Sequence, residues 1–251
     1  MGSLEGRRIF ITGASGGLGE RFAHVCAEQG AAIILGARRT DRLKQVANSI
    51  NAKGGSSLAI ELDVTDEASI ISSFDIAERE IGALDGVVVN AGVESTGLAT
   101  AIAVEDFDRV FAVNVRGAFL TAREGARRMQ KSGTASNGRI VFISSITARM
   151  ATPAIIPYSA SKAAVSHMSR SLAREWARTG PNVNCLSPGY AASEMTNDWF
   201  STEGGEKQLK GFPRRRLLEP DGLDGALLYL LSDSAKNTTG ADLIVDDGQS
   251  L

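Results

Sequence analysis

"ITGASGGLGE", residues 11–20, places Gly13, Gly17 and Gly19 in a G-x-x-x-G-x-G spacing. The stretch follows the β-branched run RRIFIT (7–12) and opens a segment of helical periodicity. Glycines at a strand-to-helix turn permit the close backbone approach that lets amide groups and a helix N-terminus face a pyrophosphate. The stretch therefore predicts a dinucleotide-binding unit at the start of the chain.

Six further short apolar runs alternate with helical segments. They are AAIILGA (31–37), SSLAIELDV (56–64), LDGVVVN (84–90), GRIVFIS (138–144), NVNCLSP (182–188) and ADLIVDD (241–247). Near-continuous apolar strands separated by helices predict a seven-stranded parallel sheet with helices on both faces, a doubly wound α/β fold of the Rossmann type. Ligands of such sheets bind at the carboxyl ends of the strands.

The composition favours one domain and a small-molecule partner. Of 251 residues 43% are hydrophobic, and 27 basic and 29 acidic residues are mixed along the chain to a net charge of -2. This balance gives no long-range field for nucleic acid or an anionic membrane. Because no repeat or linker divides the chain, we expect a single domain over residues 1–251.

The N-terminus and the cysteines indicate location and redox state. MGSLEGRRIFITG lacks the apolar run of a signal peptide, and AAIILGA is far too short to span a bilayer, so we expect a cytoplasmic protein. Cys26 and Cys185 have no C-x-x-C spacing and only two histidines to join them. This pattern predicts two buried free thiols and no metal site.

The glycine stretch also spells G-x-S-x-G around Ser15, the form of a hydrolase nucleophile elbow. An elbow there needs an oxyanion loop from an earlier strand and a histidine on a late loop. No strand precedes this one, His24 falls in the first predicted helix, and His167 lies in an amphipathic helix. The sequence therefore disfavours a serine hydrolase.

YSASK (158–162) places Tyr158 and Lys162 four residues apart, on one face of a helix. An ammonium near a phenol supplies roughly the 4 kcal/mol that lowers a tyrosine pKa by about three units. Such a pair can exchange a proton with a carbonyl or alcohol oxygen while a nicotinamide exchanges the hydride. On its own, however, this spacing more often marks a surface helix pair.

The residues after the second strand indicate which dinucleotide is bound. Ala37 stands where an acid would read the ribose 2′-hydroxyl, and Arg38 and Arg39 follow. An arginine there accommodates a 2′-phosphate, and Arg38 is the better candidate because it comes first. We expect a preference for NADP(H), with NAD(H) as the alternative.

Seven short motifs, spread in this order along the chain, add to this interpretation: TGASGGLG (12–19), DV (63–64), NAG (90–92), VN (113–114), SS (144–145), YSASK and SPG (187–189). With them the chain resembles the short-chain dehydrogenase/reductase family over essentially its whole length, most of all its 3-oxoacyl-(acyl-carrier-protein) reductases. The resemblance implies a carbonyl reductase, an NADP(H)-dependent enzyme that interconverts a ketone or aldehyde with an alcohol. The alternatives are an NAD-dependent alcohol dehydrogenase of the same family and a non-catalytic dinucleotide-binding regulator.

The resemblance also implies roles for single residues. Asn114, Ser145, Tyr158 and Lys162 would form the catalytic tetrad, in which Ser145 bonds the substrate oxygen, Asn114 joins a proton relay and Lys162 holds the nicotinamide ribose. Asn90 would hold the cofactor loop. The implied cofactor-binding residues are Gly13, Ser15, Gly17, Leu18, Gly19, Arg38, Arg39, Asp63, Val64, Asn90, Ala91, Gly92, Tyr158, Lys162, Pro188, Gly189 and Ser193.

One irregular stretch, at about 188–221, predicts an excursion above the sheet that serves as a substrate lid; a solvated loop is the alternative. Its apolar residues suit a steroid, aromatic, terpenoid or acyl-thioester carbonyl: Tyr190, Met195, Trp199, Phe200, Leu209 and Phe212. PRRR (213–216) would attract an acidic carrier or a coenzyme phosphate, or simply form a solvated turn. Asp247 stands where the family commonly has glycine, which would alter a C-terminal turn or a subunit contact.

The helix expected from about 157 to 178 has an apolar surface wider than one stripe: Ala160, Ala163, Ala164, Val165, Met168, Leu172 and Trp176. Such a helix needs more than one neighbour. A partner subunit would supply the second, in a homo-oligomer that the resemblance implies to be a dimer or, more often, a homotetramer. Complete burial within the monomer is the alternative.

Overall fold

The computed structural model describes residues 2–192 and 194–251, so Ser193, an implied cofactor contact, lies outside the described residues. Within them, seven parallel strands form one sheet in the order β3-β2-β1-β4-β5-β6-β7. Their bounds are β1 (Arg8–Thr12), β2 (Ala32–Ala37), β3 (Ser56–Glu61), β4 (Gly86–Val89), β5 (Arg139–Ile143), β6 (Asn182–Pro188) and β7 (Asp242–Val245). The predicted fold is confirmed, with strand ends that differ by at most three residues.

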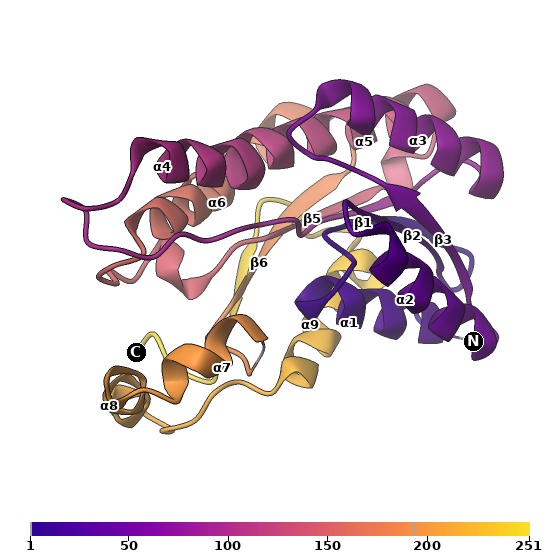
Figure 1. Cartoon of the computed structure of the whole chain (residues 1–251). Helices are drawn as coiled ribbons and strands as arrows, with labels where there is room; N and C mark the ends of the chain where they lie inside the picture. Colours follow the sequence, from indigo (N-terminus) through magenta and orange to yellow (C-terminus); the bar gives the residue numbers. More distant parts are fainter. Residues whose placement is uncertain (1, 193) are drawn as a thin grey trace.

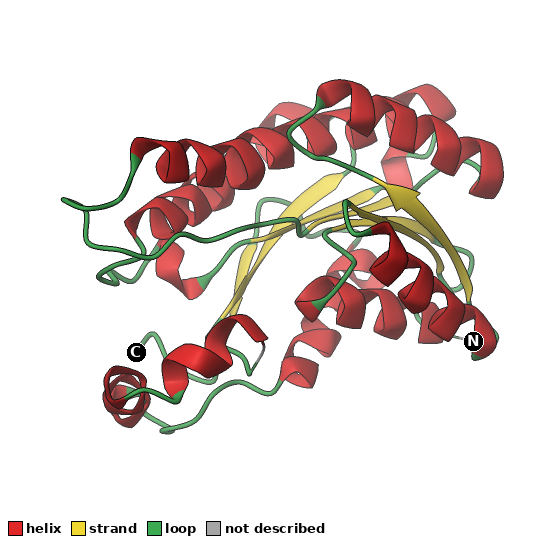
Figure 2. Cartoon of the chain, viewed as in Figure 1, coloured by secondary structure: helices red, strands yellow, loops and turns green. Residues whose placement is uncertain are grey.

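Helices cover both faces of the sheet (Figures 1 and 2). One layer holds α1 (Gly17–Glu28), α2 (Thr40–Ala52) and α9 (Asp224–Leu231), and the other holds α3 (Glu67–Ile81), α5 (Ala118–Ser132) and α6 (Ile156–Trp176). Strand β1 shows why both faces are apolar: Ile9 and Ile11 enter one core cluster and Phe10 enters the other, where its ring stacks on Phe74 at 4.8 Å. Successive side chains of a strand point to opposite faces, so a doubly covered strand is apolar throughout.

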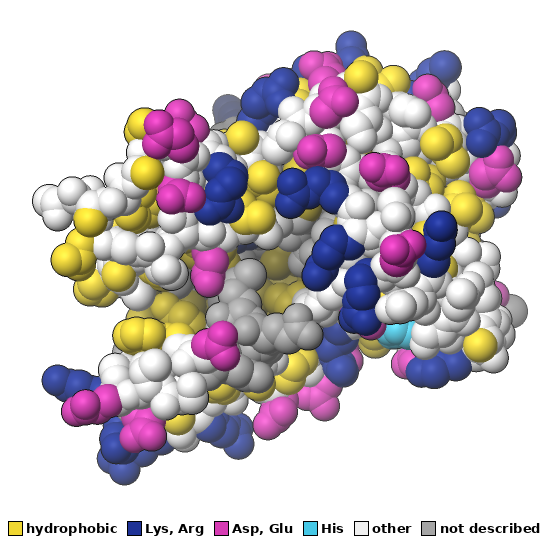
Figure 3. Space-filling model, in the orientation of Figure 1, with side chains coloured by type: hydrophobic (Ala, Val, Ile, Leu, Met, Phe, Trp, Pro, Cys, Tyr) yellow, Lys and Arg dark blue, Asp and Glu magenta, His cyan; other side chains and the backbone are white. Residues whose placement is uncertain are grey.

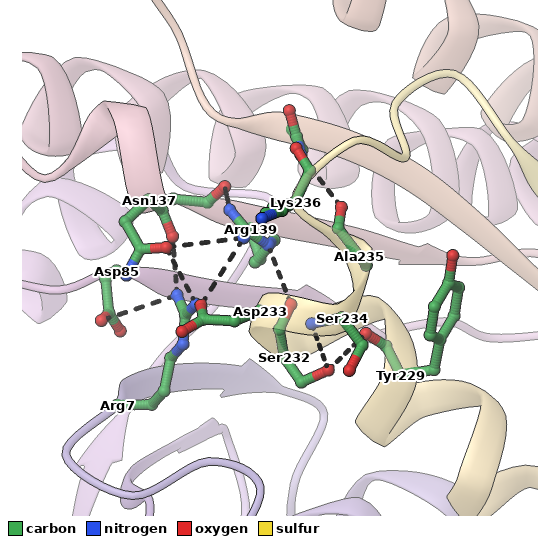
Figure 4. Close-up of polar contacts among 12 residues, drawn as sticks. Arg7, Asp85, Asn137, Arg139, Tyr229, Ser232, Asp233, Ser234, Ala235 and Lys236 are labelled. Carbon is green, nitrogen blue, oxygen red and sulfur yellow. Dashed lines mark hydrogen bonds and ion pairs between the residues drawn. The ribbon is translucent and has the colours of Figure 1, made fainter.

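Two arginines are buried at the amino ends of the central strands (Figure 4). Arg7 donates to the backbone and side chain of Asn137, at 2.6 and 3.1 Å, and to Asp233, and it lies 3.7 Å from Asp85. Arg139 is 2% exposed, donates to the carbonyl of Ser232 and lies 3.8 Å from Asp233. A buried guanidinium is tolerated only when it is paired and hydrogen-bonded. This cluster ties β1, β4 and β5 to the turn after α9.

The stretch at 188–221, expected to form an excursion above the sheet, is largely helical. It contains α7 (Glu194–Phe200) and α8 (Glu203–Gly211), which lie below and to one side of the sheet in Figure 1. Its two ends pair with each other: Leu218 donates its N–H to the carbonyl of Tyr190 at 2.9 Å, and Ala191 forms a parallel bridge with Leu218. The excursion therefore leaves and rejoins the fold at one point.

Residues near the C-terminus clamp both ends of the excursion. Asp247 accepts a hydrogen bond from Arg216 at 2.6 Å and forms an ion pair with Arg214, with 2.9 Å between nitrogen and oxygen. Gln249 accepts from the N–H of Tyr190 and donates to the carbonyls of Tyr190 and Arg216. Asp247 has a φ of 55°, the left-handed region that favours the glycine expected at this place. Two arginines of PRRR are thus paired within the chain, and the unusual aspartate is their partner.

Helix α6 is covered only in part. Val165 and Leu172 are buried, Met168 and Trp176 pack partly against the core, and Ala160 and Ala163 are exposed. Both cysteines are buried and free, as predicted. Within the described part of the chain, every helix is too short or too polar to cross a bilayer.

Candidate active-site cleft

A cleft of about 870 Å³ lies at the carboxyl ends of the strands, between the glycine-rich turn and α7. Figure 3 shows the molecule hollowed at this side, with hydrophobic side chains within the hollow. Except for Ser193, every implied cofactor-binding residue lines it: Gly13, Ser15, Gly17, Leu18, Gly19, Arg38, Arg39, Asp63, Val64, Asn90, Ala91, Gly92, Tyr158, Lys162, Pro188 and Gly189. Ser145 lines it as well, whereas Asn114 is buried behind it.

The glycine turn forms a cradle that only glycine permits. Gly13 has a φ of +70°, and a Cβ on Gly19 would lie 2.4 Å from the carbonyl oxygen of Gly13. Asn90 ties the start of this turn to the end of β4, because its Nδ2 donates to the carbonyl of Thr12 at 2.9 Å. The Thr12 hydroxyl, which the sequence analysis missed, accepts from the N–H groups of Asn90 and Ala91. With the N-terminus of α1 facing it, the cradle fits a pyrophosphate.

The two arginines after β2 differ in their contacts. Arg39 donates to the hydroxyl and the carbonyl of Ser15, at 3.1 and 3.2 Å, and is thereby tied to the glycine turn. Arg38 lines the cleft, and its guanidinium forms no hydrogen bond or ion pair with any residue that the structure describes. Beside it, the N–H of Thr65 lowers the pKa of Asp63, with a smaller contribution from Arg38. An unpaired guanidinium at this place fits a 2′-phosphate.

Tyr158 and Lys162 face the cleft from one side of α6, as predicted, with Lys162 Nζ 5.5 Å from the centre of the tyrosine ring. The predicted lowering of the tyrosine pKa is wrong for this structure. Burial raises the pKa of the Tyr158 phenol, and the charge of Glu94 raises it further. The ammonium lies over the ring and donates to the carbonyl of Ile143 at 2.8 Å. Burial lowers the pKa of Lys162 to about 8.

Ser145 is oriented by a residue that the sequence analysis missed. It caps a short 3₁₀ helix, η3 (Ile146–Ala148), and its Oγ accepts from the N–H of Thr147 at 3.1 Å and from Thr147 Oγ1 at 3.0 Å. A hydroxyl has two lone pairs and one proton, so Ser145 keeps only its proton for a further partner. Thr147 thus makes Ser145 a hydrogen-bond donor toward the cleft.

Asn114 acts as a clamp behind the cleft. It lies in a π-helical turn, η1 (Ala112–Gly117), which follows α4 (Val104–Phe111). Its Oδ1 accepts from the N–H of Val93, and its Nδ2 donates to the carbonyl of Val93 and to Ser161 Oγ, all within 2.8–2.9 Å. Both amide protons are therefore used within the protein. Ser144 is also structural, since it donates to the carbonyl of Lys162.

The surroundings of Ser15 differ from those of a hydrolase nucleophile. Ser15 Oγ accepts a hydrogen bond from Arg39, and the two histidines lie away from the cleft, His24 within α1 and His167 on the exposed side of α6. No nucleophile–base pair forms at the glycine turn. Among the described residues there is no group of three His, Cys, Asp or Glu side chains able to hold a metal ion.

Known proteins resemble this chain along nearly its whole length. A family model described as short chain dehydrogenase matches residues 7–204. Gluconate 5-dehydrogenase of Gluconobacter oxydans is 33% identical over 98% of this chain and 95% of its own length. D-threitol dehydrogenase of Mycolicibacterium smegmatis is 31% identical over 99% and 94%. The crystal structure of gluconate 5-dehydrogenase from Burkholderia cenocepacia, in complex with NADP and tartrate, has a TM-score of 0.93 at 31% identity and covers 98% and 96% of the two chains.

Proposed function

The chain belongs to the short-chain dehydrogenase family, which makes it an NAD(P)-dependent oxidoreductase, and from this premise we propose that it prefers NADP(H) and interconverts a ketone or aldehyde with a secondary or primary alcohol. One observation carries the proposal. A single cleft has a glycine cradle and the unpaired Arg38 at one end, and Ser145, Tyr158 and Lys162 at the other. Both relatives named as dehydrogenases above, and the neighbour with NADP, support it.

The residues divide into those that hold the cofactor and those that act on the substrate. Gly13, Gly17 and Gly19 would face the pyrophosphate, Arg38 the 2′-phosphate, and Asp63 the adenine. The bound nicotinamide would supply or accept the hydride. On the protein side, Lys162 remains largely protonated at neutral pH, because its pKa of about 8 lies above 7. It can therefore donate hydrogen bonds to a ribose.

Tyr158 would move the proton. Its raised pKa keeps the phenol protonated at neutral pH, so it can donate a proton to a substrate oxygen that becomes an alkoxide. Ser145 would donate a hydrogen bond to the same oxygen, since both of its lone pairs are used by Thr147. The two donors would select a carbonyl oxygen and stabilise the developing negative charge on it.

Thr147→Val should lower kcat/KM for carbonyl reduction about fivefold, the effect of losing a hydrogen bond of about 1 kcal/mol. Without the threonine hydroxyl, Ser145 Oγ regains a free lone pair and loses its fixed orientation. The affinity for NADPH should not change. The measurement is steady-state kinetics of the wild type, Thr147→Val and Thr147→Ser. The serine variant keeps the hydroxyl and should have the wild-type rate. Equal rates in all three proteins would contradict the role of Thr147.

The proposed cofactor preference can be tested without a substrate. Titration with NADPH and NADH, followed by the fluorescence of the reduced nicotinamide, should give an NADPH Kd at least about tenfold lower, as expected for one additional charge-assisted contact. Tighter NADH binding would overturn the role of Arg38 and point to an NAD-linked alcohol dehydrogenase. If neither dinucleotide binds, the proposed function fails.

Further parts of the proposal concern assembly, location and substrate. We expect a cytoplasmic protein that forms a homo-oligomer, a dimer or tetramer. Ala160, Ala163 and Ile156 leave an uncharged exposed surface on α6, which a partner subunit would cover. The excursion would serve as the substrate lid. Only part of its apolar side chains line the cleft, namely Tyr190, Trp199 and Phe200. Leu209 does not line it, Phe212 is buried against Tyr190, and the side chain of Met195 lies outside what the structure describes. Likeness to the 3-oxoacyl-(acyl-carrier-protein) reductases stays a prediction.

A further inference from the structure

Glu94 is a carboxylate in the cleft that no described residue pairs. It follows β4 two residues after the NAG motif, lines the cleft and is partly buried. Arg109 reaches only its backbone carbonyl, at 3.4 Å, and otherwise bonds Asp106. Its carboxylate has no hydrogen bond or ion pair with the residues that the structure describes. Burial is the only cause that raises the pKa of this carboxyl.

The position of Glu94 places it beside the reacting end of the cleft. Its charge acts on the Tyr158 phenol and raises the pKa of that group. Asn114 clamps the preceding residue, Val93, through both its N–H and its carbonyl. The carboxylate is therefore held near the proposed proton donor by a short and well-anchored segment.

The cations of the cleft lie elsewhere or are already used. The basic residues that line the described part of the cleft are Arg38, Arg39 and Lys162. The two arginines lie at the end that would bind adenosine, and Lys162 donates to the carbonyl of Ile143. At the substrate end a second acid, Asp198, is exposed on α7. Acidic side chains lie on both sides of the hollow in Figure 3. An anionic substrate would meet negative charge there, and the cation that the described residues place at this end, Lys162, is already bonded to the carbonyl of Ile143.

A carboxylate accepts hydrogen bonds and cannot donate them, so its complement is a hydroxyl or an ammonium. The same end of the cleft carries the hydroxyls of Thr96 and Thr152, and a hydroxyl can both donate and accept. This combination suits a ligand with several hydroxyl groups better than an anion or a purely apolar molecule. The apolar side chains of residues 188–221 are therefore only one part of the lining.

We infer that Glu94 is a specificity-determining residue that selects neutral, hydroxyl-rich substrates, alditols and their keto forms, over aldonates. Its carboxylate accepts a hydrogen bond from a substrate hydroxyl and repels a substrate carboxylate. Glu94 takes no part in the bond changes themselves. The inference rests on the proposed function, because it concerns the substrate of that same cleft.

The test compares matched pairs in which one terminal hydroxymethyl group is replaced by a carboxylate: D-threitol with D-threonate, and D-glucitol with D-gluconate. With NADP⁺, the wild-type enzyme should favour the better alditol over its aldonate by about tenfold or more in kcat/KM, as expected for like charges a few ångströms apart. Glu94→Gln, of nearly the same shape, should reduce this ratio about tenfold. Glu94→Lys should reverse it. Glu105→Gln makes the same charge change on the exposed surface of α4 and should leave the ratio unchanged.

NADPH affinity, measured for each variant, separates this inference from the proposed function. Unchanged NADPH binding with a ratio that falls in Glu94→Gln supports the role of Glu94. Three results, each with normal NADPH binding, would overturn the inference and leave the proposed function standing. They are preferred oxidation of the aldonates, no turnover of any of the four compounds, and an unaltered ratio in Glu94→Gln. A wild-type protein that binds no NADPH overturns both.

Discussion

Tyr158→Phe should lower turnover by about 10³-fold or more, while the Kd for NADPH changes by less than about threefold. General acid catalysis by a positioned side chain contributes about 10²–10⁴-fold, and phenylalanine keeps the ring but has no proton to give. The raised pKa of Tyr158 means that its proton is present throughout the neutral range. Neutral-pH turnover should therefore depend on this hydroxyl.

The measurement is a single-turnover reduction at saturating NADPH, combined with a fluorescence titration of the same preparation. Tyr229→Phe is the matched control, because this tyrosine is exposed on α9 and its hydroxyl bonds Thr238, away from the cleft. That variant should keep wild-type rates. Substantial turnover in Tyr158→Phe would remove the tyrosine from the mechanism, and a large loss of NADPH binding would assign it to the cofactor site instead.

Arg38→Asp should change the ratio of NADPH to NADH affinity by about 100-fold. The substitution removes a charge-assisted contact worth about 1.5–3 kcal/mol and introduces repulsion toward a 2′-phosphate. An aspartate at this place can also accept a hydrogen bond from the 2′-hydroxyl of NADH. The variant should therefore lose NADPH affinity and retain or gain NADH affinity.

Parallel titrations with both reduced cofactors measure this change. Arg42→Asp is the control, because Arg42 lies on α2, is half-exposed, pairs with Glu20 and is not part of the cleft. It makes the same charge change nearby without touching the cofactor. Equal losses of NADPH and NADH affinity in Arg38→Asp would show a general electrostatic or structural effect. They would refute specific recognition of the 2′-phosphate by Arg38.

The sequence was sufficient for the fold because its signals are local and periodic. Alternating strands and helices predicted the sheet, and the four-residue spacing placed Tyr158 and Lys162 on one face of α6. The glycine turn was predicted for the same reason, since the need for glycine at Gly13 and Gly19 follows from a tight strand-to-helix turn. These features depend on residues that are neighbours in the chain.

Electrostatics and long-range contacts were harder to predict. The direction of the Tyr158 pKa depends on burial and on Glu94, which comes from another loop. The pairing of Asp247 with Arg214 and Arg216 joins segments more than 30 residues apart, and neither partner indicates the other in sequence. Thr147 is different: a serine and a threonine two residues apart at the end of a strand form a recognisable local turn motif, and this signal was overlooked.

The clamp near the C-terminus bears on how the proposed lid could be exchanged between relatives. Residues 188–221 carry the side chains that would meet the substrate, yet their two ends are bound by Asp247 and Gln249 from a separate segment. If this chain received the lid of a relative that has glycine at position 247, Asp247 would lose its two arginine partners. If that relative received the lid of this chain, Arg214 and Arg216 would have no aspartate to pair with. The unit of transfer in a chimaera is therefore discontinuous: it comprises the lid together with residues 246–249.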